Sequence, residues 1–394
     1  MGSGVSLTTP LLLGCEHGAG RRGAPRVSVL LLWERSQTGK RVLGTPRAPA
    51  HAVSPHTMRA QLRGAARRAA LGPPSRGAAA GAAQRSVFTA AQFTGPLVFV
   101  GAYTRMEGHV DGKGEGIKSY RMSPVDGSLL PLCGGLATPA GPNPTFLVAN
   151  RAGTRLYAVN ECYDGTDSTV TALSIDRASG RLEVLGSAGT GGVAGCFVTL
   201  DASEQYVLAA NYGSGSVAVI PTDEVTGVGP GVEHKQHAGE PLGPNEARQT
   251  DGPHAHAIVF GADATVAYSP DLGLDSVIRY SFDAKTGALE QVGATNASLP
   301  GAGPRHMAWS PCGKHAYVSN ELSASVTTFA LQEESGKEGE LKSVHHDSTL
   351  PSDWEMGDWL SAGGPDPENG ISQCAHVEVP LSPACCFCLP FVLC

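Results

Sequence analysis

A repeat of about fifty residues runs through the sequence and constrains the fold more than any other feature. Four similar segments carry it: LYAVNE ends at Glu161, VLAANY at Tyr212, AYSPDL at Leu272 and AYVSNE at Glu321. Counted one residue before each end, the outer spacings are 211 − 160 = 51 and 320 − 271 = 49. The middle spacing is 271 − 211 = 60, so one unit carries an insertion of about ten residues.

Each unit has the pattern of four short strands. In the clearest unit, 303–347, these are HMAWSP, HAYVSN, SVTTFAL and LKSVHH, with turn residues between them. Four strands in about fifty residues are typical of one blade of a β-propeller, so we predict an all-β fold of this kind. Complete blades are expected at about 143–190, 194–237, 252–299 and 303–347.

The two ends of the repeat are incomplete. Residues 97–132 contain only the last three strands of a unit; in a propeller the missing first strand usually comes from the far end of the chain and closes the ring. A sixth unit begins near Ile371 and then runs into the sequence ACCFCLPFVLC, so we expect no such closing strand here. We therefore expect about five to six blades, in a domain that covers 95–380.

Charge divides the chain near residue 95. Residues 1–94 carry 13 basic and 2 acidic residues (+11), whereas residues 95–394 carry 16 basic and 34 acidic ones (−18). An acidic body argues against a nucleic-acid partner, because phosphate backbones require a basic face. No apolar stretch reaches the ~18 residues of a membrane-spanning helix. We expect a protein that binds neither nucleic acid nor membrane, as a monomer or an oligomer of unknown size.

The segment 1–94 is rich in Arg, Ala and Gly, and 58–94 contains no acidic residue. This composition is typical of an organelle transit peptide, so we predict a disordered leader that directs the protein to a plastid or mitochondrion. A disordered tail on a cytoplasmic protein is the alternative. Met58 is a plausible start. The Cys-rich residues 381–394 have the character of a non-native reading frame, and five of the ten cysteines fall within the last 21 residues.

Strand order in a propeller predicts which side chains meet. The chain starts each blade at the top near the axis, and the loop after the second strand returns to the same rim. Arg305 and His306, just before the first strand of their blade, should therefore lie near Glu321, which follows the second strand. His254 and His256 start the neighbouring blade at the equivalent point, and the insertion that contains Arg248 crosses the same face.

These residue types suit acyl and proton chemistry. A Glu can act as a general base, an Arg can bind a carboxylate, a phosphate or a developing oxyanion, and a His can protonate a leaving alkoxide. An ion pair between Arg305 and Glu321 that serves only stability, with histidines that serve only the loops, is the alternative.

A family resemblance adds to this interpretation. GPHAHAI (Gly252–Ile258), PDLGLD (Pro270–Asp275), PGAGPRHMAWSPCGKHAYVSNELSASV (Pro300–Val326) and DSTLP (Asp347–Pro351) resemble the lactonase family of seven-bladed propellers. This family includes the bacterial propeller-type 6-phosphogluconolactonase and the fungal carboxymuconate cyclising enzyme. The resemblance implies that His254, Arg305 and Glu321 are catalytic, and that no metal is needed. We add His256, His306, Asn320 and Arg248 as candidate substrate-binding residues.

The sequence departs from the family pattern in three places. The family has a second active-site Arg in its sixth blade, whereas no Arg follows Arg305 here. From Leu97 to the end there are 298 residues, fewer than the ~350 that seven blades need. Blade three starts with Gly195-Cys196-Phe197, where the family often has Pro-x-His. From these departures we expect an incomplete ring with weak or no activity in the chain as written.

The resemblance favours a hydrolase of a sugar lactone, 6-phosphogluconolactone above others, acting in the pentose phosphate pathway without a cofactor. Glu321 would activate water, Arg305 would stabilise the oxyanion and His254 would assist departure of the ring oxygen. A cycloisomerase of a carboxymuconate-type diacid, with the same residues, is one alternative. A non-catalytic propeller that binds other proteins is another.

The transit-peptide interpretation predicts import. Residues 58–394 fused to a fluorescent reporter should accumulate in an organelle, because the segment 58–94 is basic and free of acids. Fluorescence microscopy of the fusion beside a version that lacks residues 58–94 measures this. A diffuse cytosolic signal from the longer fusion would contradict the interpretation.

Overall fold

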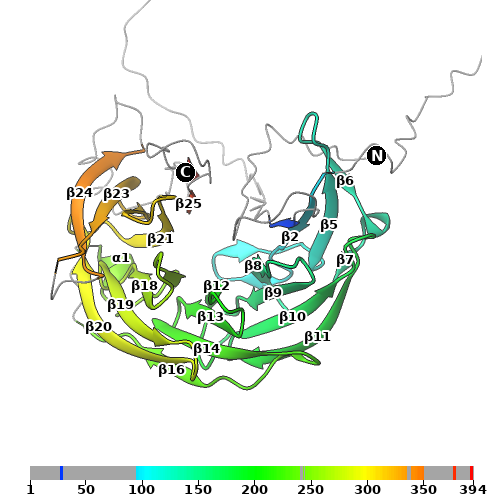
Figure 1. Ribbon diagram of the computed structural model, residues 1–394, viewed down its shortest axis with the longest axis horizontal. Helices are drawn as coiled ribbons and strands as arrows, with labels where there is room; N and C mark the ends of the chain where they lie inside the picture. Colours follow the sequence, from blue (N-terminus) through cyan, green and yellow to red (C-terminus); the bar gives the residue numbers. More distant parts are fainter. Residues whose placement is uncertain are drawn as a thin grey trace, which may run out of the picture. The chain divides into compact units, whose positions relative to one another are not determined.

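The computed structural model describes residues 95–239, 243, 245–334 and 339–349, together with three short strands at Val27–Val29, His376–Glu378 and Phe391–Leu393 (Figure 1). Nearly all regular structure in these residues is β-strand; the one α-helix among them is α1 (Glu246–Gln249), in the insertion. The predicted all-β class is confirmed.

Four successive sheets have the strand order of propeller blades. The second blade is β8 (Pro144–Ala149), β9 (Arg155–Asn160), β10 (Thr169–Ile175) and β11 (Leu182–Gly189). The third is β12 (Gly195–Leu200), β13 (Tyr206–Asn211), β14 (Ser216–Asp223) and β16 (Glu233–Gln236), with β15 (Gly227–Val228) beside β14. The fourth is β17 (Val259–Phe260), β18 (Val266–Asp271), β19 (Ser276–Asp283) and β20 (Ala288–Asn296). The fifth is β21 (Pro304–Trp309), β22 (His315–Asn320), β23 (Ser325–Leu331) and β24 (Leu341–Ser348), so all four predicted blades are confirmed.

The first blade is completed in an unexpected way. It contains β2 (Leu97–Val100), β5 (Ile117–Met122), β6 (Leu129–Pro131) and β7 (Ala137–Thr138), and a small hairpin of β3 (Met106–Glu107) and β4 (Val110–Asp111) interrupts it. The strand beside the free edge of β2 is β1 (Val27–Val29), which pairs with it in parallel. This pairing of an N-terminal strand with the first blade was not predicted from the sequence. An open sheet edge accepts any segment whose backbone groups it can pair.

At the other end, β25 (His376–Glu378) lies beside β21 and β22 of the fifth blade. It pairs antiparallel with β26 (Phe391–Leu393). This is the place of the first strand of a following blade, which agrees with a sixth unit that begins near Ile371. The predicted transit peptide and the remainder of the segments 1–94 and 381–394 lie outside the described residues.

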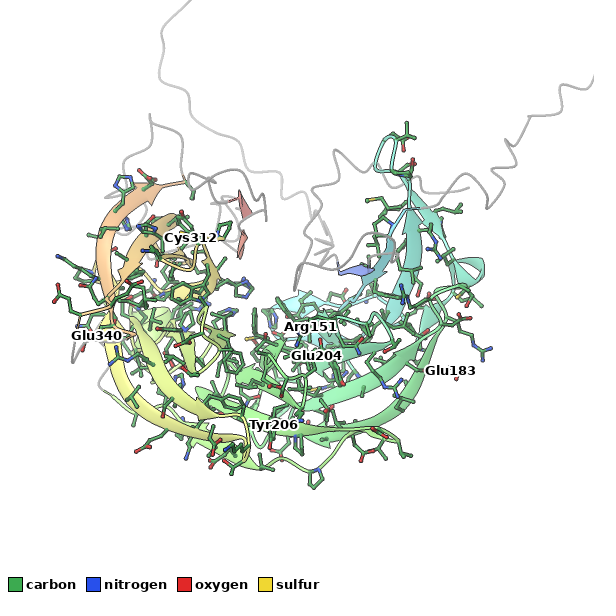
Figure 2. The ribbon with its side chains drawn as sticks, viewed as in Figure 1. Arg151, Glu183, Glu204, Tyr206, Cys312 and Glu340 are labelled. Atoms are coloured by element: carbon green, nitrogen blue, oxygen red, sulfur yellow. The ribbon has the colours of Figure 1, made fainter. Side chains whose placement is uncertain are left out.

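The second strand of a blade is more deeply buried than the outer strand. The second strands β9 and β13 are buried almost throughout, because neighbouring blades cover both of their faces, whereas the outer strand β11 is mostly exposed. Side chains also join blade to blade (Figure 2): Arg151 of the second binds Glu204 of the third, with 3.1 Å from Nε to Oε1. The Tyr206 ring of the third blade meets the Phe282 ring of the fourth edge-on at 5.8 Å.

A polar residue closes the second strand of each complete blade. Asn160 is fully buried; its Nδ2 donates to the carbonyls of Ala140 and Pro142, and its Oδ1 accepts from the hydroxyls of Thr169 and Thr171. Asn211 and Asp271 hold the equivalent places in the third and fourth blades. These residues tie the second strand to the loops that surround the axis.

Asn320 is the fourth member of this set, and this corrects its predicted role in substrate binding. Its Nδ2 donates to the hydroxyls of Ser325 (3.0 Å) and Thr327 (2.9 Å) on the adjoining strand β23, and the residue is buried. The amide is therefore engaged inside the blade, and we assign Asn320 to blade architecture.

Replacing Asn160 should show how much this arrangement contributes. Asn160→Ala leaves two carbonyls and two hydroxyls of the blade without their partner, so we expect a loss of about 3 kcal/mol in the free energy of unfolding. Asn150→Ala is the control: Asn150 also bonds to a turn but is half-buried, and water can replace it. Urea unfolding of the three proteins measures the difference, and equal losses in both variants would contradict this assignment.

Candidate active site

Two positions in each complete blade form the upper mouth of the propeller. In the second, third and fifth blades one extra residue stands at the start of the inner strand: Pro144 faces Asn160 but Phe146 faces Val159, and the same shift follows Gly195 and Pro304. In the fourth blade Ala255 faces Asp271 while Val259 faces Tyr268, which is the same shift by one residue. A bulge of this kind re-aims its side chain. The re-aimed residues are Thr145, Cys196, His256 and Arg305.

The second position follows the second strand. It holds Glu161, Tyr212, Leu272 and Glu321 in blades two to five. In the second and fifth blades the bulge residue bonds directly to the residue at this second position: Thr145 Oγ1 to Glu161 Oε2 at 2.7 Å, and Arg305 Nε to Glu321 Oε2 at 2.8 Å. We call these eight side chains, together with Arg248, the mouth.

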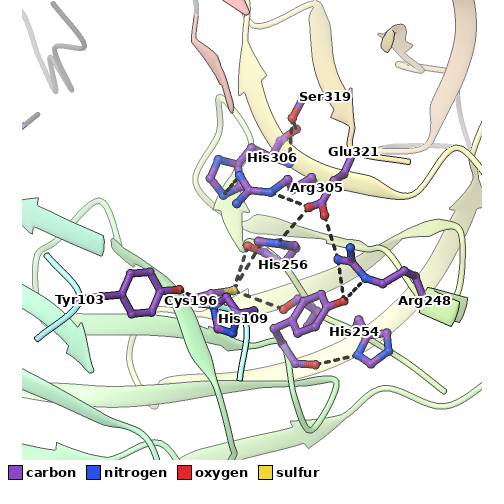
Figure 3. Close-up of polar contacts among 12 residues, drawn as sticks. Tyr103, His109, Cys196, Arg248, His254, His256, Arg305, His306, Ser319 and Glu321 are labelled. Atoms are coloured by element: carbon purple, nitrogen blue, oxygen red, sulfur yellow. Dashed lines mark hydrogen bonds and ion pairs between the residues drawn. The ribbon is translucent and has the colours of Figure 1, made fainter. Parts of the chain in front are cut away.

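Glu321 is the centre of the mouth (Figure 3). Its Oε2 accepts from Arg305 Nε, and its Oε1 accepts from Arg248 Nη2, each at 2.8 Å. His256 Nε2 lies 3.6 Å from Oε2. Glu321 is 5% exposed, and its burial alone would raise the pKa of the carboxyl; the two guanidiniums overcome this and lower the pKa to about 2. The structure therefore brings together Arg305, Glu321, His256 and Arg248, as the sequence predicted.

The insertion supplies Arg248. This residue lies in α1, which Gln249 fastens to the fourth blade by donating from Nε2 to the carbonyl of Leu272 at 2.9 Å. The guanidinium also donates to the hydroxyl of Tyr212, from Nε at 3.2 Å and Nη2 at 3.0 Å. It keeps 30% of its side chain exposed. The ten extra residues thus deliver a second cation to Glu321.

His256 is buried between a thiol and a carboxylate. Its Nδ1 lies 3.5 Å from Cys196 Sγ. Burial and the nearby positive charge of Arg305 lower the pKa of the imidazole to about 3, so the ring is neutral near pH 7. Burial and the nearby Glu161 raise the pKa of the Cys196 thiol well above its ordinary value. The thiol is therefore protonated and poorly suited to act as a nucleophile.

His254 occupies a supporting place, which corrects its predicted role at the leaving oxygen. Its Nδ1 lies 3.0 Å from the carbonyl oxygen of Tyr212, and its Nε2 lies 2.9 Å from Oδ1 of Asp251. Its ring also stacks on the Tyr212 ring, with centroids 4.5 Å apart. Both ring nitrogens already face protein acceptors. His254 therefore positions Tyr212, which in turn holds Arg248.

The ring of His306 packs among other rings, which we call the floor. Its ring meets the rings of Phe146 (5.6 Å) and Phe197 (5.3 Å) edge-on, and the His256 ring at 5.5 Å. Its Nε2 lies 3.4 Å from Arg305 Nη1. The inner strands of the second, third and fifth blades thus meet through these rings. His306 also contacts the guanidinium of Arg305.

Sequence reasoning missed Glu161, Tyr212 and Cys196. The signal was present, because these residues occupy the same repeat positions as Glu321 and Arg305. Two tyrosines of the loops, Tyr103 and Tyr163, also lie close enough to Glu161 to influence its carboxyl group. Neither carries a sequence pattern that would have revealed this contact.

Two other features, a metal site and a membrane-spanning helix, are absent from the described residues. No group of three or more His, Cys, Asp or Glu side chains in this part of the chain could hold a metal ion. No helix there is long and apolar enough to cross a membrane.

Comparison with known proteins agrees with this geometry. Residues 97–363 match the family described as lactonase, 7-bladed beta-propeller. The chain belongs to this family. It is 34% identical over 256 residues to the 6-phosphogluconolactonase of Bacillus subtilis, a match that covers 65% of this chain and 67% of that protein.

Solved structures of similar proteins include the periplasmic gluconolactonase of Pseudomonas aeruginosa, with 30% identity and a TM-score of 0.57. That match covers 66% of this chain and 69% of the Pseudomonas chain. A protein from Lactobacillus plantarum has 25% identity and a TM-score of 0.55, with coverages of 66% and 68%. The lactonase family is therefore as predicted, and each of these matches covers about two thirds of the relative's own length.

The neutral state of His256 predicts a dependence of stability on pH. The folded protein keeps the ring neutral down to about pH 3, whereas the unfolded chain binds a proton below about 6.5, so stability falls as the pH drops from 6.5. The slope from this one group approaches ~1.4 kcal/mol per pH unit. Urea unfolding between pH 6.5 and 5 should show a slope shallower by up to this amount in His256→Asn.

His345→Asn is the control, because the His345 side chain is 64% exposed on the outer strand β24. The His345→Asn variant should show the same dependence of stability on pH as the parent protein. Parallel slopes for the parent protein and His256→Asn would contradict the neutral buried imidazole.

Proposed function

We propose that this chain hydrolyses a sugar lactone, 6-phosphogluconolactone, to 6-phosphogluconate. Membership of the lactonase family supports the reaction class, and the name of the Bacillus relative supports the substrate. The observation that carries the proposal is the pair of guanidiniums held on Glu321 in the mouth. A lactone carbonyl develops negative charge as water adds to it, and fixed cationic donors stabilise that charge.

The charges of the cluster support this role. Arg248 and Arg305 contribute two positive charges and Glu321 one negative charge, so the cluster carries 2 − 1 = +1. Low solvent exposure strengthens the attraction of this charge for an oxyanion. The cluster also suits an anionic group on the substrate, such as a phosphate.

The role of Glu321 differs from the one predicted from sequence. A carboxylate whose pKa lies at about 2 takes up a proton from water poorly. We therefore assign Glu321 to orient Arg248 and Arg305, each through one of its two oxygens. In this assignment Arg305, fixed on the bulge of β21, faces the lactone carbonyl, and Arg248, on the more exposed insertion, binds the anionic end of the substrate.

An assay of the full chain tests the proposal. Acid release from 6-phosphogluconolactone, followed in a pH-stat above the spontaneous rate, should be catalysed by the parent protein. Arg305→Met should lower kcat/KM by about 10²-fold or more, the usual cost of losing an oxyanion donor. Arg181→Met is the matched control: its exposed side chain directly precedes the outer strand β11, and the variant should retain the parent rate.

Two further substrates sharpen the result. Unphosphorylated gluconolactone should be hydrolysed with a higher KM, and Arg248→Met should remove most of the difference between the two lactones. A carboxymuconate substrate tests the cycloisomerase alternative. Absence of lactone hydrolysis by the parent protein would contradict the proposed function.

A further inference from the structure

The mouth contains a second buried glutamate on the same scaffold as the first. Glu161 follows β9 as Glu321 follows β22, and each is preceded by the Asn that closes its blade. Each carboxylate accepts a hydrogen bond at Oε2 from the bulge residue of its own blade. The backbone N–H groups are held in the same way: Glu161 N donates to the Asn143 carbonyl and Glu321 N donates to the Gly303 carbonyl. The two glutamates are therefore equivalent in position.

Their partners are chemically opposite. Glu321 is bound by two guanidiniums, whereas Glu161 accepts a hydrogen bond from the neutral hydroxyl of Thr145 and has the hydroxyls of Tyr103 and Tyr163 nearby. The ring of His109 packs on both tyrosines, with centroid distances of 5.5 and 4.6 Å, and covers them. Burial raises the pKa of Glu161, and the hydroxyls and the more distant Arg305 oppose it without reversing it. The pKa of Glu161 is thus raised by its surroundings, whereas the pKa of Glu321 is lowered.

Both carboxyl groups interact electrostatically with the same thiol, that of Cys196. The thiol of Cys196 lies within the influence of Glu161, Arg305 and Glu321 together, and the charge of Arg305 also reaches Glu161. The floor joins the two sides, because Phe146, next to Thr145, meets the ring of His306, next to Arg305. The Arg305–Glu321 pair and the Thr145–Glu161 pair are therefore connected through one contact between rings next to them in sequence.

We propose that Glu161 is a further catalytic residue, whose carboxyl group donates the proton that the ring oxygen of the lactone takes up as the ring opens. The inference rests on the proposed function. The reacting end of a lactone offers only acceptors, the carbonyl oxygen and the ring oxygen. Arg305 serves the first. Thr145 occupies an acceptor site on Glu161 Oε2, so a proton on the other oxygen is available for the second.

The step balances without a co-reactant. The water oxygen bonds to the carbonyl carbon, the bond from that carbon to the ring oxygen breaks, and its electron pair stays on the ring oxygen. That oxygen takes the proton of Glu161 and becomes the hydroxyl group of the product. The attacking water loses both of its protons in forming the product carboxylate. One replaces the proton on Glu161 and the other is released to solvent.

Glu161→Gln tests the inference, because glutamine keeps the shape and the hydrogen bonds but carries no transferable proton. We expect kcat for 6-phosphogluconolactone to fall by about 10²-fold or more, with KM changed by less than about threefold. The parent protein should lose kcat as the pH rises and Glu161 ionises, and Glu161→Gln should lack this alkaline limb. Glu204→Gln, at the contact with Arg151 between blades, is the matched control.

A second variant keeps the test informative if Glu161→Gln does not fold. Thr145→Val removes the hydroxyl that donates to Glu161 Oε2 and favours the ionised carboxylate, so the alkaline limb should move to higher pH. An unmoved limb in Thr145→Val would overturn the inference, as would a raised KM with unchanged kcat in Glu161→Gln. An active parent protein with equally active Glu161→Gln rejects the inference alone, whereas an inactive parent protein rejects the proposed function.

Discussion

The extra residue at the start of each inner strand is the constraint on which the mouth depends. The ladder between the first and second strands is regular below it, and the closing Asn or Asp fixes the end of the second strand above it. Between these two fixed points one residue must leave the pleat, and its side chain turns toward the mouth. Arg305 and Thr145 hold their glutamates in this way. The geometry is a product of blade construction, which explains why it recurs around the axis.

The same scaffold produces opposite electrostatics because only the partners change. A guanidinium on the bulge, joined by Arg248 from the insertion, keeps Glu321 ionised at the cost of two ordered cations. A threonine on the bulge leaves Glu161 among hydroxyls, where burial dominates. Separating the protonation states of two carboxyl groups in one pocket is a common route to distinct acid and electrostatic roles.

Sequence reasoning recovered the blades closely and the site in part. The repeat placed all four complete blades, and strand order brought Arg305 to Glu321, since both follow from local periodicity. It assigned Asn320 and His254 to the substrate because both adjoin motif residues; the structure turns the first into the blade and uses both nitrogens of the second on protein acceptors. It overlooked Glu161 and Tyr212, although the repeat aligns them with Glu321. Position in a repeat was thus a better guide than position in a motif.

The sequence by itself determined the all-β class, the four-stranded unit, the order of the blades and the rim on which Arg305, Glu321 and His256 lie. These follow from alternation, turn residues and a fixed period, which act over a few residues at a time. Only the tertiary structure decided that Arg248 shares Glu321 with Arg305, that β1 pairs with β2, and that Glu161 lies among hydroxyls of Tyr103 and Tyr163. These contacts join residues far apart in the chain, and the protonation of each carboxyl depends on burial and on such distant partners.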